Sequence, residues 1–381
     1  MSLKEVFEQQ AEPKKERVER YEIHGVKVDV VPSEKQFAQD LFDSLAKIPT
    51  GRQAIEDMKR FKVGFFLEAD LGTAGGYFDP MANRIVMSKS RGMDFMEPAL
   101  VHEARHLLQE HTGRRDAERQ NPDYASRLMI NRATEADAQT QAIKACKEWE
   151  AIGHTGPIKG FEERYKPLVD AYNKNNSLSD AFKGWYDDER ITAAYEQGYD
   201  VEFYLSQLGS RPYNCERASL KPADIARFCG GDRVDGFEEF LESDKARQVH
   251  LLTKTAVELY DESAAAQGGE RDPSIAVLPV RDLKDNPAAQ MYADKYIAET
   301  REKFNPEKSR YAMQKTALCY AMAAVDAVEK INAAAKNGAR DAAAEKDLAT
   351  AKSRMGAAIK RRCPQNRTAQ TVALIKKSEG R

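Results

Sequence analysis

Residues 98–110 read PALVHEARHLLQE and contain the pattern His-Glu-x-x-His at His102, Glu103 and His106. Side chains four positions apart on an α-helix are separated by about 400° of rotation, so both imidazoles lie on one face and can reach one cation. Glu103 lies about 100° further round, where it can hold a water molecule against that cation as a general base. The stretch therefore predicts a catalytic zinc site on a helix.

The neighbours of this pattern favour a buried helix over an accidental match on a charged surface. Asp94 and Glu97 form a predicted capping box, and Gly113 provides a stop, so we expect a helix from about Asp94 to Thr112. The positions around the two histidines are otherwise apolar: Leu100, Val101, Ala104, Leu107 and Leu108. Histidines among aliphatic side chains need a polar partner, and a metal ion can supply one.

Catalytic zinc sites usually take three protein ligands, so a third ligand must lie elsewhere. The metzincin pattern requires Gly at position 109 and His at position 112, but the chain has Gln109 and Thr112. His111 lies about 180° from His102 around the helix and is expected to be exposed near the helix C-terminus. The ligand is therefore sought on the next helix.

The segment Asn131–Gln141, NRATEADAQTQ, offers two acids, Glu135 and Asp137. Helical rotation places Glu135 on an apolar face and Asp137 on the opposite face, among charged residues. The apolar face carries Leu128, Gln139, Ala142 and Cys146, and the charged face carries Lys144 and Glu148. A carboxylate on an apolar face is costly unless it is paired or binds a metal, so Glu135 is the expected ligand.

Two alternatives to this assignment stay open. Glu135 could instead form a buried salt bridge with Arg105 or Arg132. Asp137 is the reserve ligand if the helix is rotated or kinked.

The stretches ALVHEARHLLQE, residues 99–110, and ATEADAQ, residues 133–139, resemble a known family. They are similar to the zincin-like "putative metallopeptidase" domains of bacterial proteins of unknown function, in the gluzincin style of His-Glu-x-x-His with a downstream Glu. The resemblance covers roughly residues 60 to 150. It implies the ligands His102, His106 and Glu135 and the base Glu103. It also implies that the strand before the active helix, within GGYFDPMANRIVMS, is an edge strand.

The predicted fold class is α+β and predominantly helical. Residues 23–31, 62–67 and 83–88 have the β-branched and alternating character of strands, and the last two are separated by the turn-rich segment LGTAGGYFDPMA. Helical spacing predicts helices at residues 34–46, 94–112, 122–151, 159–173, 179–207 with a break, and 236–262. We expect a zincin-like catalytic domain with a small sheet, followed by helical extensions.

A chain of 381 residues exceeds what one compact core usually needs. The expected organisation is a flexible N-terminus at 1–20, a zincin-like metallopeptidase domain at 21–151, and a helical extension at 152–263 that packs on it. A linker or irregular loop follows at 264–286, and an Ala-rich helical region with a basic tail occupies 287–381. Asn337-Gly338 predicts a turn between two antiparallel helices in that last region.

The overall charge and the absence of apolar runs limit the partners. A formal charge of −2 gives no general attraction to nucleic acid or to anionic membranes. Because the sequence has no signal peptide and no apolar run of about 18 residues, we expect a cytoplasmic location and no membrane partner; leaderless secretion stays open. Five scattered cysteines without a Cys-x-x-Cys pair predict reduced thiols.

These observations predict a zinc-dependent peptidase that hydrolyses peptide bonds of a peptide or protein substrate by a metal-activated water, with Glu103 as general base. The strand Asn83–Ser88 is expected to bind an extended substrate, and Tyr77 and Tyr195 are candidate oxyanion donors. One alternative is a catalytically silent zincin-fold binding module. Another is a nucleic-acid-associated protein acting through Ala351–Arg381, where nine Lys or Arg stand against one Glu, although this tail lacks aromatic residues for stacking.

Overall fold

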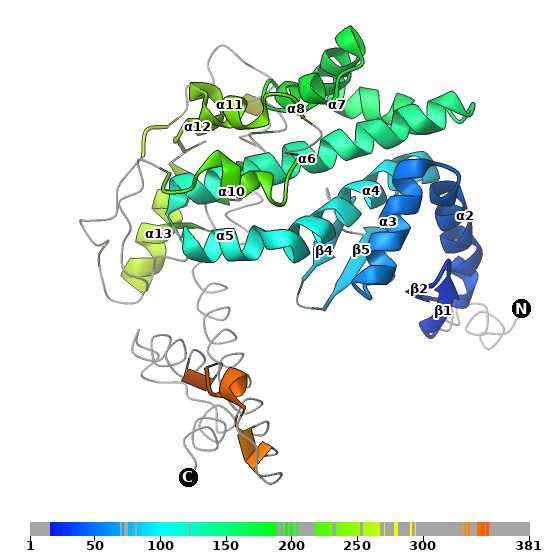
Figure 1. Ribbon diagram of the computed structural model, residues 1–381, viewed down its shortest axis with the longest axis horizontal. Coiled ribbons are helices and arrows are strands. Elements are labelled where there is room, and N and C mark those ends of the chain that lie inside the picture. The colour runs from blue at the N-terminus through cyan, green and yellow to red at the C-terminus, as the bar shows by residue number, and fades with distance from the viewer. Residues whose placement is uncertain are drawn as a thin grey trace, which may run out of the picture. The chain divides into compact units, whose positions relative to one another are not determined.

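The computed structural model describes residues 16–251 apart from short gaps, of which 205–217 is the longest. Beyond them it describes residues 254–266, 278–280 and short pieces up to residue 349 (Figure 1). The chain divides into two compact units, the first from residues 1–192 and 216–248 and the second from 193–215 and 249–381. The predicted basic tail and most of the Ala-rich hairpin lie outside the described residues.

The first unit contains one mixed sheet of five strands in the order β1-β2-β3-β5-β4. The strands are β1 (Glu19–Ile23), β2 (Val26–Val30), β3 (Gly64–Glu68), β4 (Gly76–Asp79) and β5 (Arg84–Ser88). The inner pairs β2/β3 and β3/β5 are parallel, and the outer pairs β1/β2 and β4/β5 are antiparallel. With the long helices that follow, this sheet confirms a predominantly helical α+β fold.

The sheet contains two strands that the sequence analysis did not separate. His24 and Gly25 both have positive φ, 51° and 80°, and form a two-residue hairpin turn between β1 and β2. Ordered structure therefore begins before residue 21, where the sequence analysis placed it. The edge strand β4 lies in the segment that was predicted to be only turns.

Two helices, α2 (Lys35–Ala46) and α3 (Pro49–Arg60), connect β2 to its parallel neighbour β3. Helical spacing predicted α2, whereas α3 was not predicted from the sequence. The first turn of α3 has no side-chain cap of its own; instead the carboxylate of Glu148 accepts hydrogen bonds from Thr50 N and Oγ1 at 2.8 and 2.7 Å. A residue far away in the sequence therefore accepts the hydrogen bonds that the first turn of α3 offers.

The helix that carries the His-Glu-x-x-His pattern is α4 (Met93–Gln109), which begins after Gly92 rather than at Asp94. The predicted capping box of Asp94 and Glu97 is therefore wrong. Glu97 is instead 1% exposed and bonded to His154 at 2.8 Å. After α4 a single wide turn, in which Gly113 has φ 137°, leads into α5 (Arg115–Gln120).

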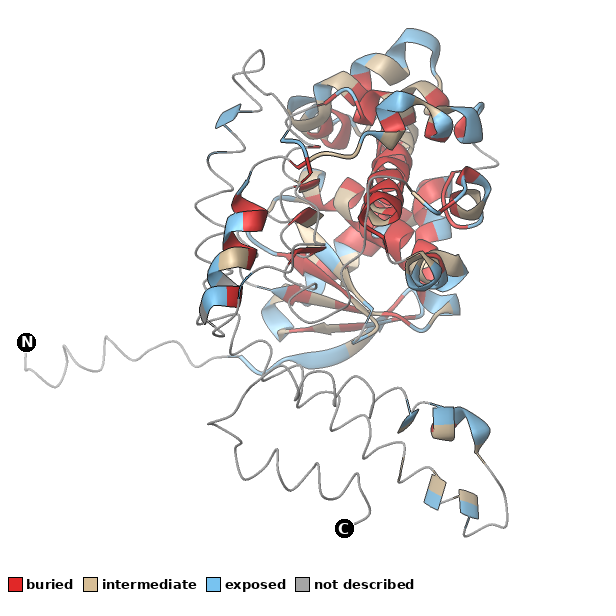
Figure 2. Ribbon diagram, turned by 90° about the vertical axis from the view of Figure 1, so that its left-hand side faces the viewer, coloured by how far each residue is buried: buried red, intermediate tan, exposed pale blue. Residues whose placement is uncertain are grey.

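Helix α6 (Tyr124–Ala151) runs through the middle of the first unit and is buried on all sides (Figures 1 and 2). It packs against α3 and α4, and against α7 (Gly156–Asn175) and α8 (Leu178–Trp185). The prediction that Asp137 lies on an outward, charged face of this helix is therefore wrong, since Asp137 is 0% exposed.

The predicted helix 236–262 is broken into α11 (Phe237–Glu242), α12 (Asp244–Arg247) and α13 (Thr255–Ala266). The short helix α10 (Pro222–Ala226) precedes them, and α10 to α12 belong to the first unit while α13 belongs to the second. Among the described residues, no helix combines the length and the apolar character needed to cross a membrane.

The cap on α3 can be tested by the substitution Glu148→Ala. The variant leaves two donors at the start of α3 without their acceptor, so the free energy of unfolding should fall by about 1–2 kcal/mol in urea titrations. Glu150→Ala, which removes an exposed partner of Lys147 on the same helix, is the matched control and should change stability by less than about 0.5 kcal/mol. Equal effects of the two substitutions would contradict the capping role.

Candidate metal centre

The structure brings three of the predicted residues together: His102 and His106 from α4, and Glu135 from α6. The two Nε2 atoms are 2.9 Å apart, and each lies 3.4 Å from one carboxylate oxygen of Glu135. The two rings are nearly perpendicular, at 89°. Each of the three residues offers one potential ligand atom, and these three atoms lie within 4.8 Å of one another.

This donor set fits a tetrahedral divalent ion. Zinc binds imidazole nitrogen and carboxylate oxygen at about 2.0–2.1 Å, which in a tetrahedron separates neighbouring ligand atoms by roughly 3.3 Å. The two nitrogen–oxygen distances of 3.4 Å match that spacing. The nitrogen–nitrogen distance of 2.9 Å is shorter, as expected for two rings that face each other across one proton.

The carboxylate of Glu135 is suited to remain ionised at this position. Burial by itself would raise its pKa, but the charge of His106 and hydrogen bonds from His102 and His106 outweigh burial and lower the pKa. An ionised carboxylate is the form that binds a cation.

Glu103 lies beside these three residues and is 7% exposed. Burial raises the pKa of Glu103, and the neighbouring charge of Glu135 adds to this effect. The two histidines and a hydrogen bond from the backbone N–H of Phe78 oppose it. A carboxylate whose pKa is moved towards neutrality accepts and returns protons more readily, which suits a general base.

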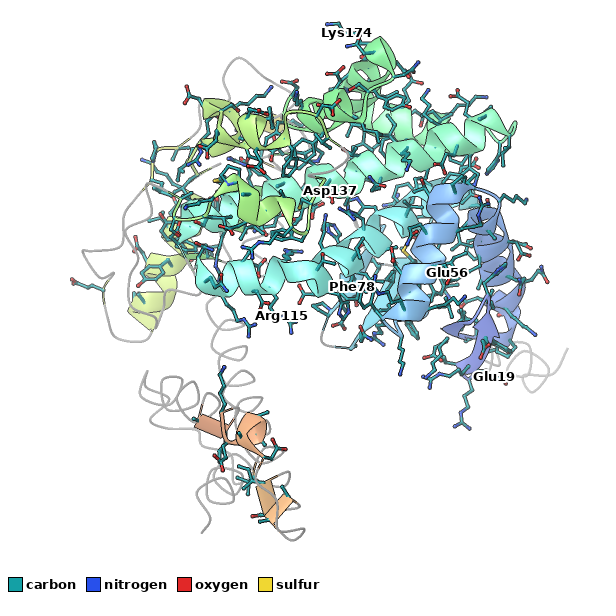
Figure 3. All side chains as sticks on the ribbon, in the orientation of Figure 1. Glu19, Glu56, Phe78, Arg115, Asp137 and Lys174 are labelled. Atoms are coloured by element: carbon teal, nitrogen blue, oxygen red, sulfur yellow. The ribbon has the colours of Figure 1, made fainter. Side chains whose placement is uncertain are left out.

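The outer edge of β4 faces Glu103. The bond from Ser88 N to Gly75 O, at 2.9 Å, shows which positions of this antiparallel pair face β5: Gly75, Tyr77 and Asp79. Gly76 and Phe78 therefore direct their backbone groups to the open edge, which agrees with the bond from Phe78 to Glu103. Figure 3 marks Phe78 on β4, next to α4.

The prediction that Asn83–Ser88 is an edge strand is wrong. β5 has β3 on one side and β4 on the other, so its backbone groups are already paired. The edge strand on this side of the sheet is β4, whose four residues lie in the Gly-rich segment that precedes β5.

Behind the histidines lies a buried polar group that the sequence analysis did not find. Nδ1 of His106 is 2.8 Å from Oε1 of Gln109, and Nε2 of Gln109 donates to Asp137 Oδ2 at 2.7 Å and to Thr134 O at 3.0 Å. Gln109 and Asp137 are both 0% exposed. In the sequence, Gln109 follows His106 by three positions, which is the helical spacing that would have indicated this contact.

Asp137 does not join the three potential ligands. Its carboxylate accepts a hydrogen bond from Arg105 Nε at 2.5 Å and from Gly230 N at 3.0 Å. The alternative in which Arg105 pairs with Glu135 is therefore wrong, because the ion pair of Arg105 is with Asp137. Arg132 donates to the carbonyl of Gln248 at 2.6 Å.

Tyr165 of α7 is a further residue near the centre that the sequence analysis missed. It has the non-helical angles φ −123° and ψ 42°, two positions before Pro167, so α7 is kinked there. Burial raises the pKa of its hydroxyl; the charge of Arg164 and a hydrogen bond with Gln139 oppose this, and the charges of Glu135 and Glu103 add to it. The hydroxyl is therefore within electrostatic reach of both carboxylates.

The other predicted residues lie in different surroundings. Tyr77 on β4 is 39% exposed, and Tyr195 belongs to the second unit, where it stacks on Tyr199. His111 is exposed and its ring stacks on Phe61 at 4.3 Å.

A second group of potential ligands consists of Asp94, Glu97 and His154. In this group His154 forms an ion pair with Glu97. The 2.8 Å contact of His154 with the buried Glu97 ties the segment after α6 to the first turn of α4. Its evident role is to fix the relative position of these two helices.

Two histidines on α4, a carboxylate from α6 and an acid beside the edge strand β4 are the residue types found in metal-dependent hydrolases. Residues 22–208 match the model of the "Putative metallopeptidase family (DUF6782)". The matched region includes the sheet from β2 onward and helices α2 to α8. No curated protein and no solved structure matches the chain.

Ion binding at this centre should stabilise the fold. Adding zinc to chelator-treated protein at about 100 times its dissociation constant should increase the free energy of unfolding by about 2.7 kcal/mol, with a corresponding rise in Tm. The variant His106→Ala should lose this rise, whereas His111→Ala, at the exposed histidine of the following turn, should keep it. An equal rise in both variants would show that zinc binds elsewhere.

Proposed function

We propose that this chain is a zinc-dependent peptidase that hydrolyses peptide bonds, with His102, His106 and Glu135 as metal ligands and Glu103 as general base. The strongest support is that the three potential ligands lie next to Glu103, and that Glu103 in turn contacts the edge strand β4. The family of residues 22–208 points to the same class of reaction.

His102, His106 and Glu135 would hold a zinc ion, which when bound would supply a more acidic water, with a pKa towards about 7, and a polarised scissile carbonyl. Glu103 then accepts the proton of the attacking water and delivers it to the amine that leaves. Burial raises the pKa of Glu103, so the carboxylate takes up a proton more readily than an exposed glutamate does.

An extended peptide fits the open edge of β4. Antiparallel pairing with the N–H of Gly76 and the outward carbonyl groups of Gly76 and Phe78 would provide binding through main-chain hydrogen bonds, with little dependence on side chains. Since Phe78 N bonds to Glu103, a strand paired there would carry a peptide bond past the general base. This supports a peptide or protein as the substrate class.

Tyr165 is the best candidate for the donor that stabilises the oxyanion. Gln139 bonds to its hydroxyl, and burial keeps the hydroxyl protonated. If the Gln139 amide is the donor in that bond, the phenolic proton is free to bond to a developing negative charge.

The rival is a binding module that keeps the fold without catalysis. Glu103 argues against it, since burying a carboxylate that is not a ligand costs free energy and brings no benefit to a structural metal site. The nucleic-acid alternative rests on the basic tail, which lies outside the described residues.

The base is tested with Glu103→Gln. The variant should bind zinc as the wild type does, as measured by elemental analysis, and should lose at least about 10²-fold of its hydrolysis of a broad peptide library, because the amide cannot take a proton. Glu110→Gln, on the turn after α4, is the matched control and should retain activity. A zinc-loaded wild type that cleaves nothing in the library would favour the silent module instead.

The proposed donor is tested with Tyr165→Phe. The value of kcat should fall by about 10²–10³, with KM and zinc content unchanged, because only the transition state carries the extra negative charge. Tyr172→Phe, two turns along the same helix, is the control and should leave kcat unchanged. If KM rises and kcat does not fall, Tyr165 contributes to substrate binding rather than to the chemical step.

A further inference from the structure

The buried contacts behind His106 determine which of its ring nitrogens carries the proton. Nε2 of Gln109 faces two groups that only accept hydrogen bonds, the carboxylate of Asp137 and the carbonyl of Thr134. Turning the amide over would set its oxygen against both acceptors in a buried site, which is strongly unfavourable. The amide therefore has one orientation, with Oε1 towards His106.

This orientation fixes the tautomer of His106. Because Oε1 of Gln109 can only accept, Nδ1 of His106 at 2.8 Å must be the protonated nitrogen. In the neutral ring, Nε2 then carries the lone pair, and this is the atom that faces His102 and Glu135. Whenever the ring is neutral, it therefore has the tautomer and direction that bind a cation.

Asp137 in turn is held by donors from outside α6. Its two oxygens accept from Arg105 Nε and from Gly230 N, in addition to Gln109. Arg105 also reaches the carbonyl of Phe228 at 3.4 Å. At Gly230 a Cβ would lie 2.9 Å from a methyl carbon of Val234 and 3.3 Å from Asp137 Oδ1, so the backbone approaches too closely for a side chain.

We propose that Asp137 is a positioning residue of the metal centre: acting through Gln109, it sets the tautomer and direction of His106, and it connects this histidine to the segment 228–230. The proposal rests on the metal site of the proposed function and not on peptide hydrolysis. The acid two positions after Glu135 therefore belongs to the centre without being a ligand.

The test is a double-mutant cycle on zinc affinity, measured by competition with a chromophoric chelator. Asp137→Asn and Gln109→Leu should each weaken zinc binding by about 10–100-fold, since each frees the His106 ring from its orienting contact. The double variant should be no weaker than Gln109→Leu alone, because Asp137 acts through Gln109. Thr140→Val, which removes a buried hydroxyl on α6, is the control and should keep wild-type affinity.

A second measurement applies to the metal-free protein and remains valid if a variant is unstable. Long-range proton–nitrogen NMR should show the proton of His106 on Nδ1 in the wild type, and a mixture of tautomers in Asp137→Asn. Additive losses in the cycle, or unchanged zinc affinity and unchanged tautomer in both single variants, would overturn the proposal. Failure of the wild type to bind zinc, with the Nδ1 tautomer still fixed by Asp137, would overturn the proposed function and leave the orienting role intact.

Discussion

The packing of α4 against α6 is the contact on which the centre depends. Residues 135 and 137 are about 200° apart on a helix, so the shorter arc between them is centred near Thr134, Ala138 and Ala145. These small residues are fully buried, and α4 lies against α6. Glu135 and Asp137 therefore reach α4 from opposite sides of one interface, the first at the histidines and the second at Arg105 and Gln109.

This geometry explains which part of the centre the sequence could predict. The spacing of His102, Glu103 and His106 needs only a helix, and the structure places them as the helical rotation requires. Glu135 was selected because it lies on an apolar face, and it does lie beside the histidines. The same reasoning failed for Asp137, because it assumed that α6 has one face in water. A helix enclosed on all sides has no such face, so the periodicity of its apolar residues cannot show which side packs against which neighbour.

The errors in the sheet have a different cause. β4 has only four residues, it begins at Gly76 directly after Gly75, and its alternation is too short to show a period. Helix α3 begins at Pro49 with Thr50 and Gly51, residues that commonly mark turns, and it is capped by Glu148 from almost a hundred positions away. Gly51 is required there, since a Cβ would lie 2.2 Å from the carbonyl oxygen of Leu45. Both elements are fixed by contacts that no local pattern contains.

The surroundings of the centre extend further along the chain than the family match does. That match ends at residue 208, yet Phe228 and Gly230 supply backbone groups to Arg105 and Asp137, and they belong to the same compact unit as α4 and α6. Asp137 is buried and charged, so the free-energy cost of burying its carboxylate depends on every hydrogen-bond donor around it. The N–H of Gly230 shares the charge of this carboxylate with Arg105 and Gln109, and Gln109 in turn contacts His106. The residues after 208 are therefore part of what holds the histidine in its binding form.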